Sequence, residues 1–187
     1  MRFLASISTL TCIALVCGCA QQLEQVKQVN QALSTINGAP RGGNQPMNGG
    51  LQPTPSQTAA IDSQLSGPMG DKNIAEARKE AAANISKLLN IMSCTPPGSY
   101  PSAYLTPMKA PGSNATLHVP PTAHMRYHPK SQCLTVSRLD GWRMQAKNAF
   151  QFRAVYSSDA SGEGASYGYT FIKQPDGAWL LGDPAYY

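Results

Sequence analysis

Residues 72–92 carry the strongest helical pattern in the chain, and this pattern limits the fold more than any other feature. Apolar residues recur there at every third or fourth position, which is the spacing of a helix with one buried stripe. Asp71 directly precedes the pattern and suits an N-cap, and three prolines within residues 95–101 end it. Because the second half of the stripe is the more apolar, we expect that half to pack on a sheet. The stripe consists of Ile74, Ala77, Ala81, Ile85, Leu88, Leu89 and Met92.

The chain after residue 104 changes to the period-two pattern of β-strands. Prolines divide its first part, in which residues 115–119 and 123–127 are candidate short strands. Residues 133–139 and 142–147 predict a hairpin around an Asp140-Gly141 turn, and residues 149–157 alternate strictly. After a Gly- and Ser-rich loop, residues 167–173 alternate again, and residues 179–181 close the sheet. We therefore predict an α+β domain in which one main helix packs on a four- to five-stranded antiparallel sheet.

Residues 38–70 precede this domain and have the composition of a linker. Twelve of these 33 residues are Gly or Pro, and the others are largely Asn, Gln, Ser and Thr. Such a segment has too few apolar residues to form a core. We expect a disordered linker over residues 38–70 and a folded domain over residues 71–187.

Residues 19–37 form a separate short region with a narrow helical stripe. The apolar positions are three or four residues apart, and the remaining positions are mostly Gln, Asn and Lys. An isolated helix of this length is marginal in water. Three interpretations stay open: a helix on a membrane surface, a helix paired with a partner, or a frayed tether. The stripe consists of Leu23, Val26, Val29, Leu33 and Ile36.

The first eighteen residues have the features of a secretion signal. Arg2 supplies a positive start, residues 3–16 are mostly apolar, and the small residue Gly18 stands before Cys19. The apolar stretch is too short to span a membrane. We therefore expect residues 1–18 to be removed during export.

Four residues at the end of this signal, Val16-Cys17-Gly18-Cys19, resemble the lipobox of bacterial lipoproteins. The resemblance implies that Cys19 becomes the new N-terminus and carries a diacylglycerol thioether and a further acyl chain, which together hold a protein stably on a membrane. Ala20 stands where the family uses Asp for inner-membrane retention, so the resemblance implies the outer membrane, with the domain facing the periplasm or displayed outside. Cleavage after Ala20 is the alternative, and it would remove Cys19.

Two cysteines remain for the folded domain once the signal and the lipidated residue are set aside. Cys94 and Cys133 are an even pair in an exported chain, and exported chains meet an oxidising environment. Neither lies in a C-x-x-C pair or beside a His, as a metal site would favour. We predict a disulfide between Cys94 and Cys133.

The charge of the chain is modest, but its distribution is uneven. The formal net charge of +5 does not by itself argue for a nucleic-acid partner, and we expect none. No acidic residue occurs between Glu80 and Asp140. That segment either faces an anionic envelope polymer or lipid headgroup, or is a solvated face without carboxylates. Its basic residues are Lys87, Lys109, Arg126, Lys130 and Arg138.

No pattern of residues points to catalysis, a cofactor or a metal. His118, His124 and His128 lie within eleven residues, but no carboxylate or thiol completes a ligand set. No serine lies in a nucleophile elbow, and no glycine-rich loop opens a helix with the Lys or Ser of a phosphate site. The carboxylates of the β region fall in predicted turns, a loop or the tail. We therefore expect a protein that is not an enzyme and has no cofactor or metal.

Exposed aromatic and basic side chains are the remaining candidates for function, because protein interfaces are enriched in Tyr and Arg. The candidate interaction surface consists of Arg126, Arg143, Arg153, Tyr186 and Tyr187. The first hypothesis is a non-enzymatic outer-membrane lipoprotein that binds an envelope protein or polymer, as an accessory of an envelope or secretion assembly. Its strand edges would accept a partner strand.

The second hypothesis comes from the order of elements over residues 75–181, which is similar to nuclear transport factor 2-like or cystatin-like folds. The likeness implies a cone-shaped domain with a small-ligand or catalytic pocket between residues 85–92 and a concave sheet. These folds usually place more than one helix before the sheet, whereas residues 96–121 are rich in proline. The strict alternation of residues 149–157 directs apolar side chains and Tyr156 inward, which favours the first hypothesis.

Overall fold

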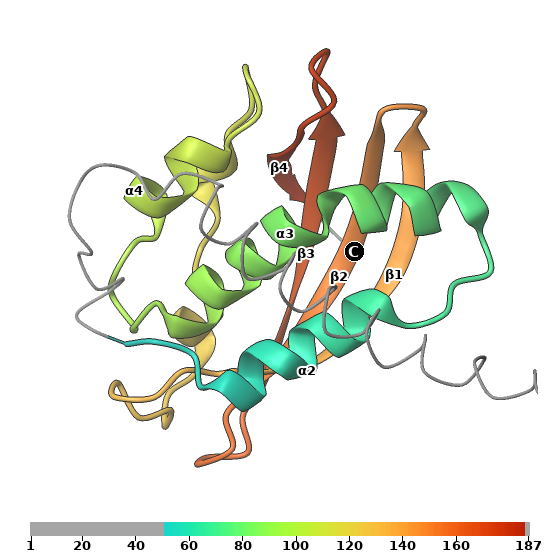
Figure 1. The fold of residues 1–187 in the computed structure, drawn as a ribbon. Helices are drawn as coiled ribbons and strands as arrows, with labels where there is room; N and C mark the ends of the chain where they lie inside the picture. Colours follow the sequence, from blue (N-terminus) through green and yellow to red (C-terminus); the bar gives the residue numbers. More distant parts are fainter. Residues whose placement is uncertain (1–50, 186–187) are drawn as a thin grey trace, which may run out of the picture. The chain divides into compact units, whose positions relative to one another are not determined.

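The computed structural model describes residues 51–185. The predicted signal, the lipidation of Cys19, the stripe of residues 19–37 and the residues Tyr186 and Tyr187 lie outside this range. The described chain forms helices first and a sheet afterwards (Figure 1). In order, the elements are α2 (Pro55–Ser66), α3 (Lys72–Cys94), α4 (Ser102–Leu105), the 3-10 turns η2 (Thr106–Met108), η3 (Ala115–Leu117) and η4 (Pro121–His124), and strands β1 (Thr135–Ala146), β2 (Ala149–Ser157), β3 (Gly164–Lys173) and β4 (Trp179–Ala185).

The long helix α3 confirms the predicted helical stripe. Its N-cap is Asp71, whose Oδ1 accepts hydrogen bonds from the backbone N–H groups of Asn73 and Ile74 at 2.8 and 3.2 Å. The helix continues two residues beyond the predicted end, to Cys94. All seven residues of the predicted stripe are buried.

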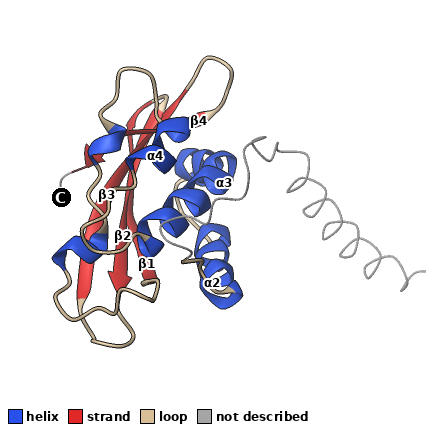
Figure 2. Ribbon diagram, turned by 90° about the vertical axis from the view of Figure 1, so that its left-hand side faces the viewer, coloured by secondary structure: helices blue, strands red, loops and turns tan. Residues whose placement is uncertain are grey.

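The sheet has four antiparallel strands in the order β1-β2-β3-β4, each paired with its neighbour in sequence. The two long helices α2 and α3 cover one face of this sheet (Figure 2). Between them lies an aromatic core in which Phe150, Phe152 and Phe171 are fully buried. The predicted α+β class is therefore confirmed over the described residues, with four strands in the sheet.

Helix α2 corrects the predicted linker. Residues 55–66 form a helix inside the segment expected to be disordered, so the folded part begins before residue 71. Ile61 and Leu65 enter the core, and Gln64 Nε2 donates a 3.0 Å hydrogen bond to the backbone O of Val136 in β1. Thr54 and Gln57 form a capping box at its N-terminus. The two buried side chains and the capping box are enough to hold α2 in place, because α3 and β1 supply the rest of the core.

Strand β1 corrects the predicted Asp140-Gly141 turn. The strand runs through both residues and ends at Ala146, so the hairpin turn is Lys147-Asn148. Gly141 has a φ of +65° at an irregularity between Asp140 and Arg143 in the pairing with β2, which makes it a β-bulge. The extra residue turns Trp142 onto the core face, where its ring stacks on Phe152 at 4.6 Å.

The two short strands predicted between residues 115 and 127 are not present. Residues 115–119 and 123–127 overlap the 3-10 turns η3 and η4 instead. The segment runs along the outer edge of β4, where Ala110 N–H donates to the backbone O of Leu181 at 2.8 Å. Asn114 N–H donates to the carboxylate of Asp183 at 2.6 Å. This proline-rich segment therefore covers the edge of β4 with an irregular backbone.

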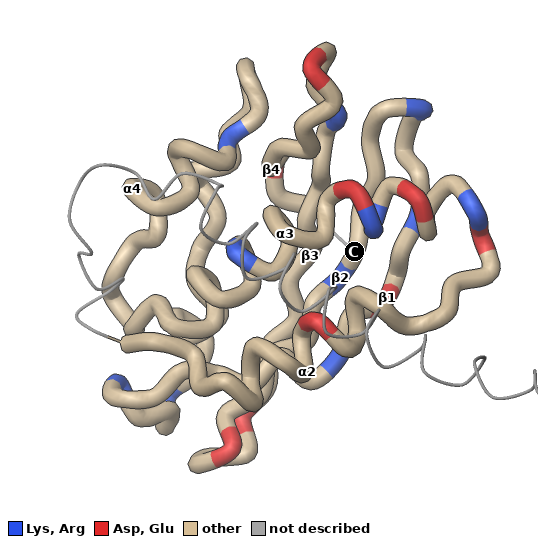
Figure 3. Tube along the Cα trace, in the orientation of Figure 1, with Lys and Arg blue, Asp and Glu red and all other residues tan. Residues whose placement is uncertain are grey.

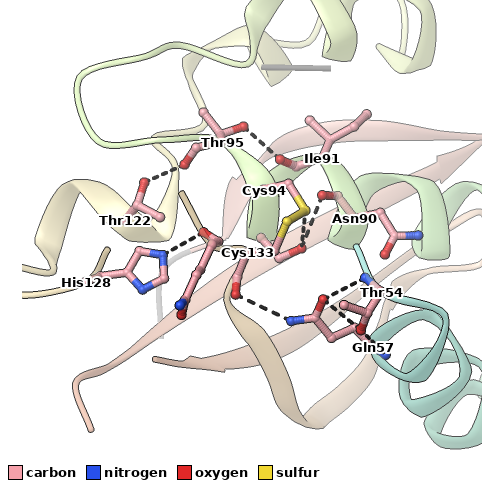
Figure 4. Close-up of a disulfide and its surroundings, with 11 residues drawn as sticks. Thr54, Gln57, Asn90, Ile91, Cys94, Thr95, Thr122, His128 and Cys133 are labelled. Carbon is pink, nitrogen blue, oxygen red and sulfur yellow. Dashed lines mark hydrogen bonds between the residues drawn. A yellow bond between two sulfur atoms is a disulfide. The ribbon is translucent and has the colours of Figure 1, made fainter. Parts of the chain in front are cut away.

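The predicted disulfide between Cys94 and Cys133 is present, with an S–S distance of 2.04 Å (Figure 4). It joins the last residue of α3 to the residues that lead into β1. Leu134 N–H donates to the backbone O of Ser93 beside it, at 2.9 Å. The hydroxyl of Thr122 donates to the backbone O of Thr95 at 2.6 Å. The crosslink thus ties the helical layer to the sheet.

Candidate binding groove

β3 extends beyond the described part of β4. β3 starts at Gly164, but the last described pair between β3 and β4 is Gly168 with Ala185. Over residues 51–185, no strand pairs with residues 164–167 on that side.

The hydrogen bonds of the neighbouring hairpin show which backbone groups this edge presents. Ser158 N–H donates to Glu163 O, and Lys173 N–H donates to Asn148 O, both at 2.8 Å. Because bonding alternates along an antiparallel strand, odd-numbered residues between 163 and 173 bond to β2 and even-numbered residues face the other way. The N–H and C=O groups of Gly164 and Ser166 therefore point away from β2.

A groove of about 480 Å³ lies along this edge. Residues 165–168 of β3 line it together with the end of β4, the segment 117–119, His124 and Arg153. No Asp or Glu is among its described lining residues. Figure 3 shows α4 and the loops beside it in tan with scattered blue and no red, because the acid-free stretch of the sequence supplies this side of the domain.

One wall of the groove presents apolar side chains to solvent. Leu117 is 67% exposed and Val119 is 40% exposed, although both are large aliphatic residues. His118 between them is buried, with its ring stacked on Tyr169 at 5.2 Å. Its Nε2–H points to the backbone O of Gly182 at 3.4 Å. Burial lowers the pKa of His118 to about 4, so its imidazole is neutral at physiological pH and fixes this wall without a charge.

The floor of the groove includes an unsatisfied hydroxyl. The phenol oxygen of Tyr167 is buried and has no hydrogen-bond partner among the described residues. Burial raises the pKa of this phenol. The ring of Tyr167 lies 6.0 Å from that of His124, between centroids. A buried hydroxyl without a partner is unfavourable.

Arg153 lies on the opposite side of the groove. Arg153 donates from Nε and Nη2 to the two carboxylate oxygens of Asp140, at 2.7 and 3.1 Å, and Arg138 Nε lies 2.7 Å from Asp140 Oδ2. The hydrogen bond from Arg153 is the main cause that holds the pKa of Asp140 below its usual range. One carboxylate therefore serves two guanidinium groups, and the three side chains carry a net charge of +1.

The edge of the sheet on β1 is poorly suited to a partner strand. The register of β1 with β2 has three irregularities within twelve residues. Gln64 of α2 already bonds the outward C=O of Val136. Bulges and charged side chains are the usual devices that protect an edge from strand addition.

The structure brings only part of the predicted interaction surface to this groove. Arg153 lines it, whereas Arg143 lies on β1 and donates to Gln151 Oε1 at 2.9 Å. Arg126 belongs to a loop, with its guanidinium 5.5 Å from the ring centroid of Tyr127. Sequence reasoning missed Leu117, Val119, Ser166 and Tyr167, because no local pattern shows which distant segments line a groove.

The hairpin tip between β2 and β3 holds the loop that contains Arg126. Glu163 carboxylate oxygens accept the backbone N–H groups of Arg126 and Tyr127 at 2.8 and 2.9 Å. Burial raises the pKa of Glu163, but the hydrogen bonds from Ser161 and from this loop outweigh it, and the pKa is lowered. Glu163, which the sequence predicted to lie in a loop, thus acts as a structural clamp that holds the backbone of Arg126 and Tyr127.

One Ser–His pair has the residue types of nucleophilic catalysis. His128 Nδ1 lies 2.9 Å from Ser158 Oγ, and His128 Nε2–H points to the backbone O of Gln132 at 2.9 Å. Ser158 is only 1% exposed, so a substrate cannot reach its hydroxyl, and the pair holds the loop to the hairpin. The described residues contain no group of three or more metal-ligating side chains.

A second hollow, of about 470 Å³, lies between the start of α3 and the far ends of the strands. Glu80 in its lining accepts hydrogen bonds from Lys173 Nζ at 2.7 Å and Trp179 Nε1 at 2.8 Å. The hydrogen bond from Lys173 is the main cause that lowers the pKa of Glu80. Because these polar groups satisfy one another, the hollow offers a ligand less than the groove at β3.

No protein-family model matches the chain, and comparisons with curated proteins and with solved structures also return no match. The likenesses to bacterial lipoproteins and to the two fold families therefore stay predictions. None of the helices within residues 51–185 is both long and apolar enough to cross a membrane. The functional argument rests on the geometry of the groove.

Proposed function

We propose that this chain is a lipid-anchored binding module of the bacterial cell envelope, which holds an extended segment of a partner protein in the groove beside β3. One observation carries the proposal: a groove of about 480 Å³ lies beside β3, and the aliphatic side chains of Leu117 and Val119 are exposed along its wall. Addition of a strand to a sheet edge is a common mode of peptide recognition.

The site favours an extended peptide over a compact small molecule. A peptide backbone can satisfy the N–H and C=O groups of Ser166 as β4 satisfies those of Gly168. Each hydrogen bond gained in this way contributes about 1 kcal/mol net, and contact with the side chains of Leu117 and Val119 adds apolar burial. The region between residues 85–92 and the sheet is filled by side chains, since Leu88, Leu89 and Met92 are fully buried. A cone-shaped pocket there has no such support.

The anchor in this proposal is Cys19, carrying acyl chains in the outer membrane, with the domain in the periplasm. Its support is the lipobox-like sequence and the disulfide, which fits an exported protein. The module is proposed to be non-enzymatic, and the enclosed Ser158 supports this. Fractionation of the Cys19→Ala variant tests the anchor, because the mature chain should then move from the membrane to the soluble fraction. Retention at the membrane would contradict it.

The groove is tested by changing one backbone donor. Ser166→Pro removes the outward N–H of residue 166, whereas the ladder with β2 uses residues 165 and 167 and stays intact. Proline is tolerated on a strand edge, and Ala165 before it is already extended. Ser166→Ala is the matched control, because it removes the hydroxyl and keeps the N–H. A photo-crosslinking residue at position 117 reports the partner in native membranes, and one at the exposed Lys87 reports background.

We expect one crosslinked species at position 117 that is absent at position 87, is kept in Ser166→Ala and is lost in Ser166→Pro. Circular dichroism and the unfolding midpoint confirm that both variants fold. A crosslinked species that survives Ser166→Pro unchanged would show that strand addition at β3 is not how the partner binds.

A further inference from the structure

We propose that α2 is a detachable strap. It leaves the domain as one unit, about a hinge at residues 67–71, while the disulfide-bonded remainder of the domain stays folded. The inference does not depend on the groove beside β3. It depends on how few contacts hold α2, and on what holds the remainder in its absence.

Helix α2 has a small apolar seat. Two of its twelve residues are buried, Ile61 and Leu65, whereas eleven of the 23 residues of α3 are buried. It packs mainly on α3 and β1, and it lies below α3 in Figure 1. Because an isolated helix of twelve residues is marginal in water, α2 is helical only while this seat holds it. A segment with so few buried apolar side chains opens at a lower free energy than the core does.

The polar contacts of α2 with the rest of the domain are separate hydrogen bonds. Gln57 Nε2 donates to the backbone O of Cys133 at 3.4 Å. Gln64 Nε2 donates to the backbone O of Val136 at 3.0 Å, and a hydroxyl of α3 donates to Asp62 Oδ1 at 3.2 Å. No salt bridge within residues 51–185 involves α2. Water can replace each of these partners once α2 leaves, so their net contribution to closure is small.

Arg78 of α3 is the charged tie to α2, and its hydrogen bonding is incomplete. Its guanidinium is buried and donates to the backbone O of Gln64 and of Gly67, at the C-terminal end of α2. Among residues 51–185 no carboxylate forms a salt bridge with it, and its buried Nε has no hydrogen-bond partner. A buried cation needs full hydrogen bonding to offset its loss of water. Water would complete the hydrogen bonding of Arg78 in the open state, which lowers the cost of opening.

The hinge and the remainder of the domain are built independently of α2. Residues 67–70 are Gly-Pro-Met-Gly, and they separate the end of α2 from the N-cap of α3. Asp71 caps α3 by accepting from N–H groups of α3 itself, so this helix keeps its N-terminus when α2 leaves. The other end of α3 is bound to the start of β1 by the Cys94–Cys133 bond. Helix α3 therefore stays on the sheet while α2 opens.

Opening lengthens the chain that leads to the domain. In the proposed function, residues 20–50 connect the lipid on Cys19 to α2, so a pull from the membrane acts on α2 before it acts on the remainder. Release of residues 55–71 adds roughly 50 Å of reach. This consequence rests on the proposed anchor, whereas the opening itself does not.

Native-state hydrogen exchange tests the strap. The mature chain carries Cys19→Ala so that it is free of lipid, and its disulfide is kept. Exchange of the amides of residues 58–66 in α2 and 81–92 in α3 is followed in urea below the unfolding transition. Phe171→Leu is the test variant, because Phe171 is buried in β3 and its replacement weakens only the remainder. Ile61→Ala is the matched variant, because it weakens the seat of α2.

We expect the α2 amides to exchange about a hundredfold faster than the α3 amides, with one shared protection factor and little dependence on urea. Phe171→Leu should speed exchange in α3 about tenfold and leave exchange in α2 unchanged, because the remainder is still folded in the open state. Ile61→Ala should speed exchange in both helices by the same factor, because the seat of Ile61 is lost in the open state and in the unfolded state alike.

Two results would overturn the strap. Equal protection and equal urea dependence in α2 and α3 would show that α2 opens only when the whole domain unfolds. An acceleration of α2 exchange by Phe171→Leu, by the factor found in α3, would show the same. If Phe171→Leu does not fold, the urea dependence in the parent chain decides alone. Neither result bears on the groove or the anchor, which the crosslinking and fractionation experiments test separately.

Discussion

The buried imidazole of His118 should make the domain less stable as the pH falls from about 6.5 to about 4. His118 is 2% exposed, and burial lowers its pKa from 6.5 in the unfolded chain to about 4 in the fold. Between these values the unfolded chain binds a proton that the folded chain does not, so the free energy of unfolding decreases as the pH falls. The two pKa values imply a loss of about 2 kcal/mol between pH 7 and pH 4.5.

Urea unfolding at pH 7.0 and pH 4.5 measures this loss. His118→Phe keeps an aromatic ring against Tyr169 but has no titratable nitrogen. Between pH 7.0 and pH 4.5, its free energy of unfolding should therefore fall by about 2 kcal/mol less than that of the parent chain. His124→Gln is the control, because His124 is exposed and its replacement should leave the pH dependence of the parent. The comparison uses differences between pH values, so any constant loss from the substitution cancels. Equal pH dependence in His118→Phe and the parent chain would refute the assignment.

Three further predictions concern contacts that hold the domain together. Replacing Cys94 and Cys133 by Ala should lower the free energy of unfolding by about 4 kcal/mol, measured in urea, because the bond closes a loop across 39 residues of sequence; an unchanged midpoint would contradict this. Arg78→Met should destabilise the domain by roughly 2 kcal/mol and speed amide exchange in α2, since Arg78 donates to the backbone O of Gln64 and Gly67; the exposed Lys79→Met should do neither. Glu163→Gln should make residues 126–130 more sensitive to trypsin, because a neutral amide is the weaker acceptor for the backbone of this loop; cleavage at the parent rate would argue against the clamp.

The parts of the fold that could be predicted are those whose signal is local. Helix α3 carries its own buried stripe and its own N-cap, and β2 alternates over its whole length. The disulfide followed from an even pair of cysteines in an exported chain. In each case the residues that carry the signal are the ones that form the element, so no knowledge of the tertiary structure was needed.

Helix α2 could not be predicted because distant residues stabilise it. Only Ile61 and Leu65 of its twelve residues are buried, and its glycine- and proline-rich flanks are typical of a linker. Its side chain Gln64 bonds a strand 72 residues away, and Arg78 of α3 bonds its C-terminal carbonyl. Tertiary contacts outweigh a weak local pattern here.

The turn predicted at Asp140-Gly141 was wrong for a related reason. The dipeptide is a strong signal for a tight turn, because both residues tolerate positive φ. In the fold, Gly141 uses its positive φ for a bulge, and Asp140 is held in the strand by Arg153 from β2. The groove was hidden in the same way, since its lining comes from segments far apart in the sequence and not from any motif.

The Cys94–Cys133 bond also has a mechanical consequence. A pull that separates the helices from the sheet would pass directly from the end of α3 into the start of β1 through this covalent bond. The intervening residues 95–132, which include Leu117 and Val119, lie in a closed loop outside that path. A force that acts between α3 and β1 would therefore bypass the loop that carries the apolar wall of the groove.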